Sequence, residues 1–139
     1  MRQPGKRPLQ HYFFLNPYED VRFTRCPKCG GKTRLRKFVL VIHVEPRDPL
    51  ALRKTCRYCV ACDLIIAHRD ELEAQLYLVF SKQAPQSVGN DYLVLGTLEP
   101  ALWQQGRQQP LNMADVLDQM YLFKDELHFE PANYGWAKD

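Results

Sequence analysis

Two Cys-x-x-Cys pairs, Cys26/Cys29 and Cys59/Cys62, constrain the fold of this 139-residue chain more than any other feature of its sequence. A tight turn lets the two thiolates of one pair reach the same ion, and a second pair from a distant strand completes a tetrahedral set of four sulfurs. Such a site has no open coordination position, so its role is structural. The pattern predicts a Zn²⁺ site that ties two distant segments together.

A fifth cysteine, Cys56, leaves the ligand set open, because Cys56/Cys59 overlaps the second pair. The residue after a metal-binding turn often takes a positive φ, which Gly or Asp tolerates better than a β-branched residue. Gly30 follows the pair Cys26/Cys29, and Asp63 follows Cys59/Cys62. Val60 follows the alternative second pair, Cys56/Cys59. We therefore favour four metal ligands: Cys26, Cys29, Cys59 and Cys62. Cys56 is then a buried neighbour or a thiol that exchanges into the site.

Two alternatives remain for the cysteines. All five could be unligated core residues, although their paired spacing argues against this. A disulfide framework is disfavoured because five is an odd number and no secretory signal is evident: the apolar run 12–15 is too short for one. No stretch is long enough to cross a bilayer. Together these features predict a cytoplasmic protein.

Basic and acidic residues are unevenly distributed, although the net charge is only +3. Residues 1–69 hold fifteen Lys and Arg against five Asp and Glu, whereas residues 70–139 hold four against eleven. Seven basic residues surround the first cysteine pair without an acidic residue among them, and we predict that they contact nucleic acid: Arg22, Arg25, Lys28, Lys32, Arg34, Arg36 and Lys37. Alternatively they balance the charge of the thiolates, or they pair with the acidic half.

The hydrophobic pattern predicts strands around the cysteine pairs. Residues 38–44 are apolar on both faces, which indicates a strand covered on each side, and residues 64–67 read as a return strand. The long spacing between the pairs leaves room for an extended hairpin. Residues 91–97 predict a further buried strand after a loop at 84–90.

Helical periodicity begins at Asp70, which forms an apparent capping box with Glu73. One face of this helix is apolar: Leu72, Leu76, Val79 and Phe80. Pro100 suits the first turn of a short helix ending near Gly106, and Asn112 suits the cap of another. We therefore expect two or three helices.

We predict a single α+β domain over residues 1–139: a zinc-ribbon β-hairpin core at about 20–70, a further strand and two or three helices at about 70–126, and an aromatic tail at 127–139. The tail holds Phe129, Tyr134 and Trp136, which is too aromatic for a fully solvated end. We expect it to dock on the domain rather than on a partner.

No catalytic constellation is evident. Gly30-Gly31-Lys32-Thr33 ends like a phosphate-binding loop, but that motif needs a glycine where Cys26 stands. The four histidines are scattered, and none lies beside a nucleophile. His43 and His68, next to the cysteine pairs, are the two that could replace a sulfur. We therefore predict no catalytic residues, with a zinc enzyme as the less favoured alternative.

The Cys-Pro-Lys-Cys-Gly turn and the second Cys-x-x-Cys-Asp, followed by an apolar strand, resemble the zinc-ribbon class of small metal domains. The run 54–68 resembles uncharacterised bacterial proteins with the same Cys-x-x-Cys knuckles. This resemblance covers about residues 20–70. It implies a ribbon fold of the kind used in transcription, translation or RNA handling, but fold alone does not fix function.

Two functions from different classes follow from these patterns. In the first, a non-enzymatic protein with a structural Cys₄ zinc site associates with nucleic acid or a ribonucleoprotein through its basic N-terminal half. In the second, the zinc-stabilised domain is a scaffold whose acidic half and aromatic tail dock on a protein partner or a second copy.

Overall fold

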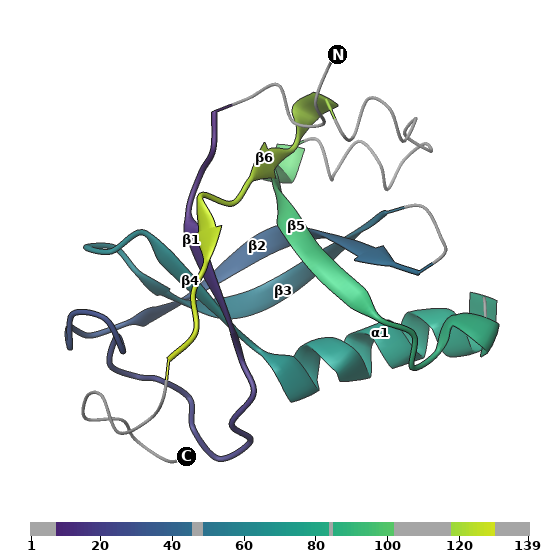
Figure 1. Ribbon diagram of the computed structural model, residues 1–139, viewed down its shortest axis with the longest axis horizontal. Coiled ribbons are helices and arrows are strands. Elements are labelled where there is room, and N and C mark those ends of the chain that lie inside the picture. Colours follow the sequence, from purple (N-terminus) through teal and green to yellow (C-terminus); the bar gives the residue numbers. More distant parts are fainter. Residues whose placement is uncertain (1–7, 46–48, 84, 102–117, 130–139) are drawn as a thin grey trace.

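The computed structural model describes residues 8–45, 49–83, 85–101 and 118–129 (Figure 1). In chain order its elements are β1 (Tyr12–Asn16), β2 (Arg34–Val44), β3 (Leu50–Cys59), β4 (Leu64–His68), α1 (Arg69–Gln83), the 3-10 helix η1 (Pro85–Ser87), β5 (Tyr92–Leu98), β6 (Tyr121–Leu122) and β7 (Asp125–Glu126). Neither α1 nor η1 is long and apolar enough to cross a membrane.

All these strands form one sheet in the order β6-β5-β2-β3-β4-β1-β7. Neighbouring strands are antiparallel, except that β1 runs parallel to both β4 and β7. β6 and β7 follow each other closely in the chain and yet occupy the two ends of this order. Residues 121–126 therefore connect one edge of the sheet to the other, and the sheet curls into a half-barrel to allow it.

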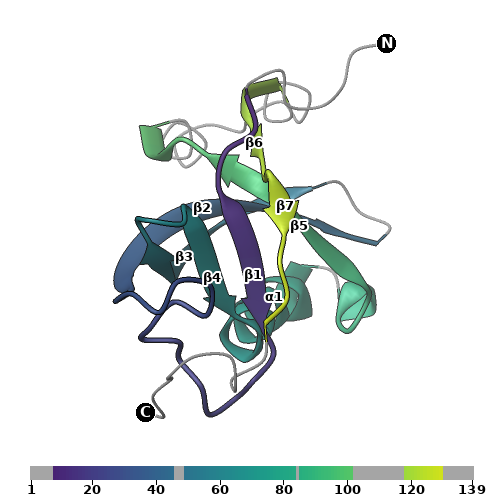
Figure 2. The same ribbon diagram turned by 60° about the vertical axis from the view of Figure 1, so that its left-hand side comes forward.

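Backbone hydrogen bonds show how this connection is held. The Gln10 N–H donates to the Leu122 carbonyl (2.9 Å), and the Lys124 N–H donates to the His11 carbonyl (2.7 Å). On the other side, the Phe123 N–H donates to the Leu95 carbonyl of β5 (3.3 Å). Figure 2 shows β7 alongside β1, with β6 continuing away from it. One short segment thus pairs with both edges of the sheet.

The predicted fold class is wrong. The described part of the chain is mostly β, a seven-stranded curled mixed sheet with one complete α-helix, and not a small zinc-ribbon hairpin with two or three helices. The β2–β3 hairpin is extended as expected, but β5 pairs with β2 and β4 pairs with β3, so it lies in the middle of the sheet. The physical reason is the apolar character of both faces of β2, which an isolated ribbon cannot bury.

The alternation along β2 places its side chains in two cores. Phe38, Leu40 and Ile42 belong to the main core on the face covered by α1, whereas Val39 and Val41 belong to a smaller core on the opposite face, with Leu98 and Met120. The prediction that this strand is covered on both sides is confirmed. Its first four residues, 34–37, are exposed and extend beyond both cores toward the cysteine pairs.

Helix α1 packs on the main core through three residues of its predicted apolar face, Leu72, Leu76 and Phe80, whereas the fourth, Val79, is only partly buried. The expected capping box is absent, because the helix already begins at Arg69 and the Glu73 carboxylate accepts a hydrogen bond from the Tyr92 hydroxyl (2.8 Å). The helices expected after Pro100 and Asn112 fall largely on residues 102–117, outside the described residues; residues 100–101 and 118–119 are helical.

Candidate metal centre

The first cysteine pair lies in a tight turn between two paired residues, Arg25 and Lys32. The Cys26 N–H donates to the Gly31 carbonyl (2.7 Å), and the Gly30 N–H donates to the Cys26 carbonyl (2.8 Å). The turn reverses at Gly30, whose φ of 77° is accessible to glycine at little cost. This is the backbone conformation that the sequence predicted.

The second pair spans the connection between β3, which ends at Cys59, and β4, which begins at Leu64. Here the chain turns at Asp63 with a φ of 54°, again as predicted. The Asp63 carbonyl accepts a hydrogen bond from the Tyr12 N–H (2.8 Å), which continues the parallel pairing of β1 with β4. The turn is therefore fixed to the sheet on both sides.

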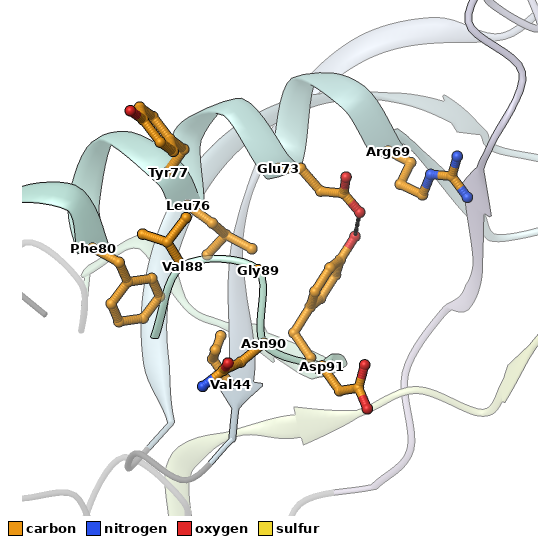
Figure 3. Close-up of a pocket in the computed structure, with 11 residues that line it drawn as sticks. Val44, Arg69, Glu73, Leu76, Tyr77, Phe80, Val88, Gly89, Asn90 and Asp91 are labelled. Carbon is orange, nitrogen blue, oxygen red and sulfur yellow. Dashed lines mark hydrogen bonds between the residues drawn. The ribbon is translucent and has the colours of Figure 1, made fainter. Parts of the chain in front are cut away.

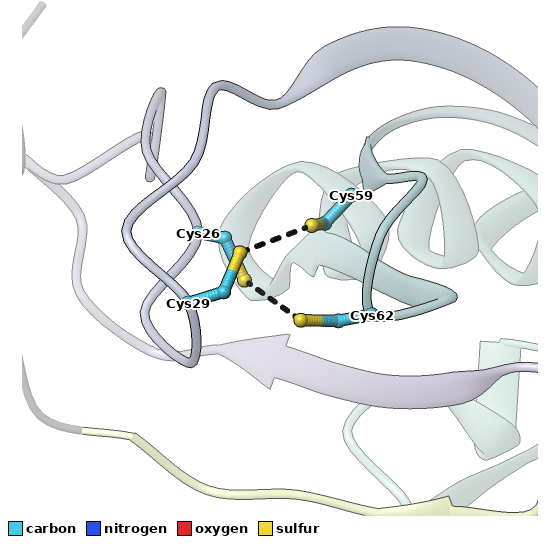
Figure 4. Close-up of side chains that lie close together, drawn as sticks. All are labelled: Cys26, Cys29, Cys59 and Cys62. Carbon is cyan, nitrogen blue, oxygen red and sulfur yellow. Dashed lines mark hydrogen bonds between the residues drawn. The ribbon is translucent and has the colours of Figure 1, made fainter.

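The four sulfurs of Cys26, Cys29, Cys59 and Cys62 lie within 4.8 Å of one another (Figure 4). The Cys29–Cys59 Sγ distance is 3.6 Å and the Cys26–Cys62 distance is 3.9 Å. Four thiolates bound to Zn²⁺ at about 2.3 Å in a tetrahedron have sulfurs about 3.8 Å apart. The donor set and its spacing therefore fit a tetrahedral metal ion.

Backbone amides stabilise the thiolate form of the first pair. The Lys28 N–H donates to the Cys26 sulfur (3.3 Å), and the Gly31 N–H donates to the Cys29 sulfur (3.4 Å). The Gly31 amide lowers the pKa of Cys29, whereas burial raises the pKa of Cys26 and of Cys62. A divalent ion would supply the positive charge that several adjacent thiolates need.

The metal centre rests on a third hydrophobic core. Cys26 and Cys59 are buried there with Phe14, Phe23 and Leu64, below the loop that carries the first pair. Phe129 packs edge-on against Phe14 at 5.3 Å between ring centroids, so the first residues of the predicted tail contact this core; residues 130–139 lie outside the described residues. This apolar core shields the sulfurs of Cys26 and Cys59 from water.

The other candidate ligands lie outside the cluster. Cys56 is buried in the main core, where its thiol contacts the Lys54 carbonyl (3.6 Å) and burial raises its pKa to about 12. His68 Nε2 interacts with the Glu19 carbonyl (3.1 Å), and His43 Nδ1 lies 3.8 Å from a Glu45 carboxylate oxygen. The cluster therefore contains the four favoured cysteines and none of these three alternatives.

The structure also contains a polar cluster that the sequence did not reveal. The Asp63 carboxylate accepts hydrogen bonds from His11 Nδ1 (2.5 Å) and the Tyr58 hydroxyl (2.6 Å), and it pairs with Lys124 (3.4 Å). Burial alone would raise the pKa of Asp63, but these hydrogen bonds outweigh it and lower that pKa. Burial and the neighbouring carboxylate raise the pKa of Tyr58 to about 12. The sequence indicates a role for the Asp63 backbone alone, and nothing in it connects Asp63 with His11.

Six of the seven basic residues predicted to contact nucleic acid are exposed: Arg25, Lys28, Lys32, Arg34, Arg36 and Lys37. None of the six forms an ion pair with a carboxylate in the described part of the chain. Arg22 differs, because it is half-buried and pairs with Glu71 at 2.8 Å. The sulfurs receive hydrogen bonds from backbone amides, and not from these side chains.

A groove of about 570 Å³ lies far from the cysteines, between α1 and the start of β5 (Figure 3). Leu76, Phe80 and Val88 form an apolar half, and Glu73, Arg69 and Asp91 line a polar half. Tyr77 at its rim is 57% exposed. The size suits a small amphipathic molecule, but the mixed charges do not select one ligand class.

No protein-family model, curated protein or solved structure matches the chain. The assignment of a function therefore depends on the geometry of the described residues.

Proposed function

We propose that the chain is a non-enzymatic zinc protein that binds nucleic acid through basic residues around a structural Cys₄ site. The observation that carries this proposal is a group of six exposed cations that have no carboxylate partner among the described residues and lie beside four clustered cysteines. The metal and the cations have separate roles in it: the ion fixes the loop, and the loop and β2 present the charges.

Zinc is the ion that best suits the donor set. Four thiolates in a tetrahedral arrangement are the ligands of structural zinc sites, and the softness of sulfur disfavours Mg²⁺ or Ca²⁺. With four protein ligands the ion has no position for a water or substrate. This supports a structural role and argues against a zinc enzyme.

Nucleic acid is favoured over the two alternative explanations of the basic residues. If these residues neutralised the thiolates directly, their side chains would contact sulfur, but the donors to sulfur are the amides of Lys28 and Gly31. If they paired with the acidic half, they would contact carboxylates, and among the described residues they do not. Unpaired surface cations in one region attract a polyanion.

The pleat of β2 limits how many cations one strand of nucleic acid can contact. Arg34 and Arg36 lie on one face of the strand, whereas Lys37 lies on the other. About three to six phosphate contacts are therefore expected, and for single strands each contributes about −0.7 to the slope of log K against log salt. The expected slope lies between about −2 and −4.

Fluorescence anisotropy with a labelled single-stranded RNA of mixed sequence, measured over a series of salt concentrations, tests this. The charge reversal Lys32→Glu/Arg34→Glu should abolish binding at low salt, because it removes two attractive contacts and adds two repulsive ones. The matched control is Arg69→Glu/Lys82→Glu on α1, which changes the net charge equally at two exposed positions. This control should reduce affinity only slightly.

Equal loss of binding in both double variants would contradict the proposal, since it would reflect net charge alone. A salt slope near zero in the wild type would contradict it as well. In either case the alternative function, a protein scaffold, is tested by size-exclusion chromatography of the same samples. A scaffold protein should assemble with itself at concentrations where no RNA is bound.

A further inference from the structure

A small hollow of about 110 Å³ lies beside β2, β5 and β6, next to the residues that precede β1. It is lined by His11, Thr97, Glu99 and Tyr121, and by Arg36 and Lys37, which border it from opposite faces of β2 just beyond Val39, where the pairing of β2 with β5 ends. We propose that this hollow binds a single phosphate-type oxyanion through His11, Arg36 and Lys37. The proposal goes beyond nucleic-acid binding and does not depend on it.

His11 is held rigidly at the back of the hollow. Its side chain is 10% exposed, and its Nδ1 pairs with the Asp63 carboxylate at 2.5 Å. The ring meets Phe38 and Tyr58 edge-on, at 5.5 and 5.7 Å between centroids. These contacts occupy one ring nitrogen and leave Nε2 without a hydrogen-bond partner among the described residues.

The backbone of His11 supports a role beyond packing. Its φ is 70°, in the left-handed region that a residue other than glycine adopts at an energetic cost. The carbonyl of the same residue accepts a hydrogen bond from the Lys124 N–H (2.7 Å), so the closing segment of the sheet holds this conformation. Strain of this kind is common where a side chain must be aimed at a ligand.

Arg36 is oriented before any ligand arrives. Its guanidinium lies over the rings of Phe38 (4.8 Å) and Tyr58 (5.1 Å), the two rings that also contact His11. A planar guanidinium fixed by stacking loses less conformational entropy when it binds an oxyanion through two parallel hydrogen bonds. Arg36 has no carboxylate partner within the described ranges, so these donors are free.

Size and charge together select the ligand. A hollow of about 110 Å³ has room for one phosphate group. Arg36 and Lys37 make it positive, and His11 can pair with phosphate in either protonation state: neutral Nε2 accepts from P–OH, and imidazolium Nε2–H donates to an ionised oxygen. Glu99, exposed on the rim, is the one opposing charge among the lining residues.

The experiment is a titration of the ¹⁵N-labelled protein with inorganic phosphate, followed by amide shifts and compared with chloride at equal ionic strength. Phosphate should shift amides that line the hollow, at residues 11, 36, 37 and 97. Lys37→Gln should weaken phosphate binding about tenfold, and Arg36→Gln should weaken it more, because each removes a charge-assisted hydrogen bond. Glu99→Gln should strengthen it by removing repulsion.

The matched control is Lys32→Gln/Arg34→Gln, two neighbouring cations that do not line the hollow. This variant should keep the phosphate affinity of the wild type while it loses affinity for RNA, so failure of one proposal is distinguishable from failure of the other. Equal shifts with chloride and phosphate would overturn the inference. So would a phosphate affinity that Lys37→Gln, which removes no aromatic contact, leaves unchanged.

Two sources could supply the phosphate, and a pair of octanucleotides distinguishes them. If a 5′-phosphorylated oligonucleotide binds more tightly than its unphosphorylated twin, and Lys37→Gln removes this advantage, the hollow takes the end of a nucleic acid. If inorganic phosphate binds and the two oligonucleotides do not differ, the natural ligand is a small phosphate compound. Both results support a phosphate pocket, and absence of phosphate binding in every arm rejects it.

Discussion

At the level of single residues, the backbone of the two cysteine turns follows from local chemistry. Gly30 and Asp63 take positive φ because each follows the second cysteine of a pair, where the chain must reverse. The same rule disfavoured Cys56 as a ligand, since a valine would then occupy the reversing position. These conclusions need only neighbouring residues, and they could therefore be reached from the sequence.

The first prediction separates the two overlapping cysteine pairs. Cys62→Ser should lose the bound metal, because three sulfurs cannot close a tetrahedral site, and should strongly destabilise the loop it holds. Cys56→Ala should keep one metal ion per chain and lower the free energy of unfolding by only about 1 kcal/mol, because it leaves a small cavity. Elemental analysis of the two purified variants measures the metal content per chain, and titration of free thiols measures how many cysteines remain protected. Loss of metal in Cys56→Ala together with retention in Cys62→Ser would show that the ligand assignment is wrong.

The polar cluster around Asp63 could not be found in the same way. Its members, His11, Tyr58, Asp63 and Lys124, come from four separate segments, and their meeting depends on the parallel pairing of β1 with β4 and on the closing segment. No local pattern encodes such a meeting. Sequence reasoning could therefore place the sulfurs but not this polar cluster, whose member His11 also lines the proposed phosphate hollow.

At the level of elements, segments with a clear apolar pattern were predictable, whereas β1, β6 and β7 were not. The apolar residues on both faces of β2 and along one side of α1 predicted these two elements close to their observed positions. β1 has five residues and pairs in parallel with a strand far along the chain, and β6 and β7 have two residues each. Their existence depends on partners rather than on periodicity, which is why a ribbon was expected instead of a curled sheet.

One contact between elements predicts a pH dependence. Lys54 of β3 is buried, with its ammonium 2.8 Å from the Glu71 carboxylate of α1, and Arg22 pairs with the same carboxylate. Burial alone would raise the pKa of Glu71, but the hydrogen bond from Lys54 outweighs it and the pKa is lowered. A lowered folded-state pKa means that this pair stabilises the fold above the unfolded Glu pKa of about 4.3 and that the contribution is lost as pH falls through the folded value.

Glu71→Gln should therefore lower the free energy of unfolding by about 1–2 kcal/mol at neutral pH, a figure reduced because the Glu71 side chain is 48% exposed. The deficit relative to wild type should shrink as pH falls below about 4, since the wild-type carboxyl then protonates as well. Urea denaturation at several pH values measures this difference. Asp91→Asn, an exposed position without an ion pair in the described ranges, is the control and should show no such trend. A deficit for Glu71→Gln that is constant with pH would exclude the ion pair as its source.

The junction of β5 and β6 allows no side chain at Gly96. A Cβ there would lie 2.0 Å from the Tyr121 carbonyl oxygen, which is far inside contact distance. Gly96→Ala should displace β6 and lower the free energy of unfolding by about 2–4 kcal/mol. Gly89→Ala is the matched control: nothing lies within 4 Å of its added Cβ, so only the cost of its positive φ, about 1 kcal/mol, applies. Hydrogen exchange should show faster exchange of the Phe123 amide in Gly96→Ala alone, and equal effects of the two substitutions would argue against this steric role.

At the level of the whole molecule, the cysteine cluster contacts one of the three hydrophobic cores of the described residues. The core below the cysteines includes Phe14, Val21 and Phe23, and the loop that carries the first pair covers it. The main core between the sheet and α1 contains no residue of that loop. The ion is therefore expected to hold the loop against the sheet, whereas the central hairpin and α1 have apolar contacts of their own.

Removal of the metal should consequently affect two regions of the molecule differently. With a strong chelator, amides of residues 17–33 should lose their protection from hydrogen exchange, because the binding free energy of the ion is also the folding free energy of that loop. Amides of β2 and α1 should remain protected at room temperature, and the melting temperature should fall by at least about 10 °C. Excess Zn²⁺ should restore both. Uniform loss of protection would mean that the metal is needed for the entire fold. Protection unchanged by chelation would mean that the four thiols pack without an ion. That second result would remove the structural basis for presenting the basic residues to nucleic acid.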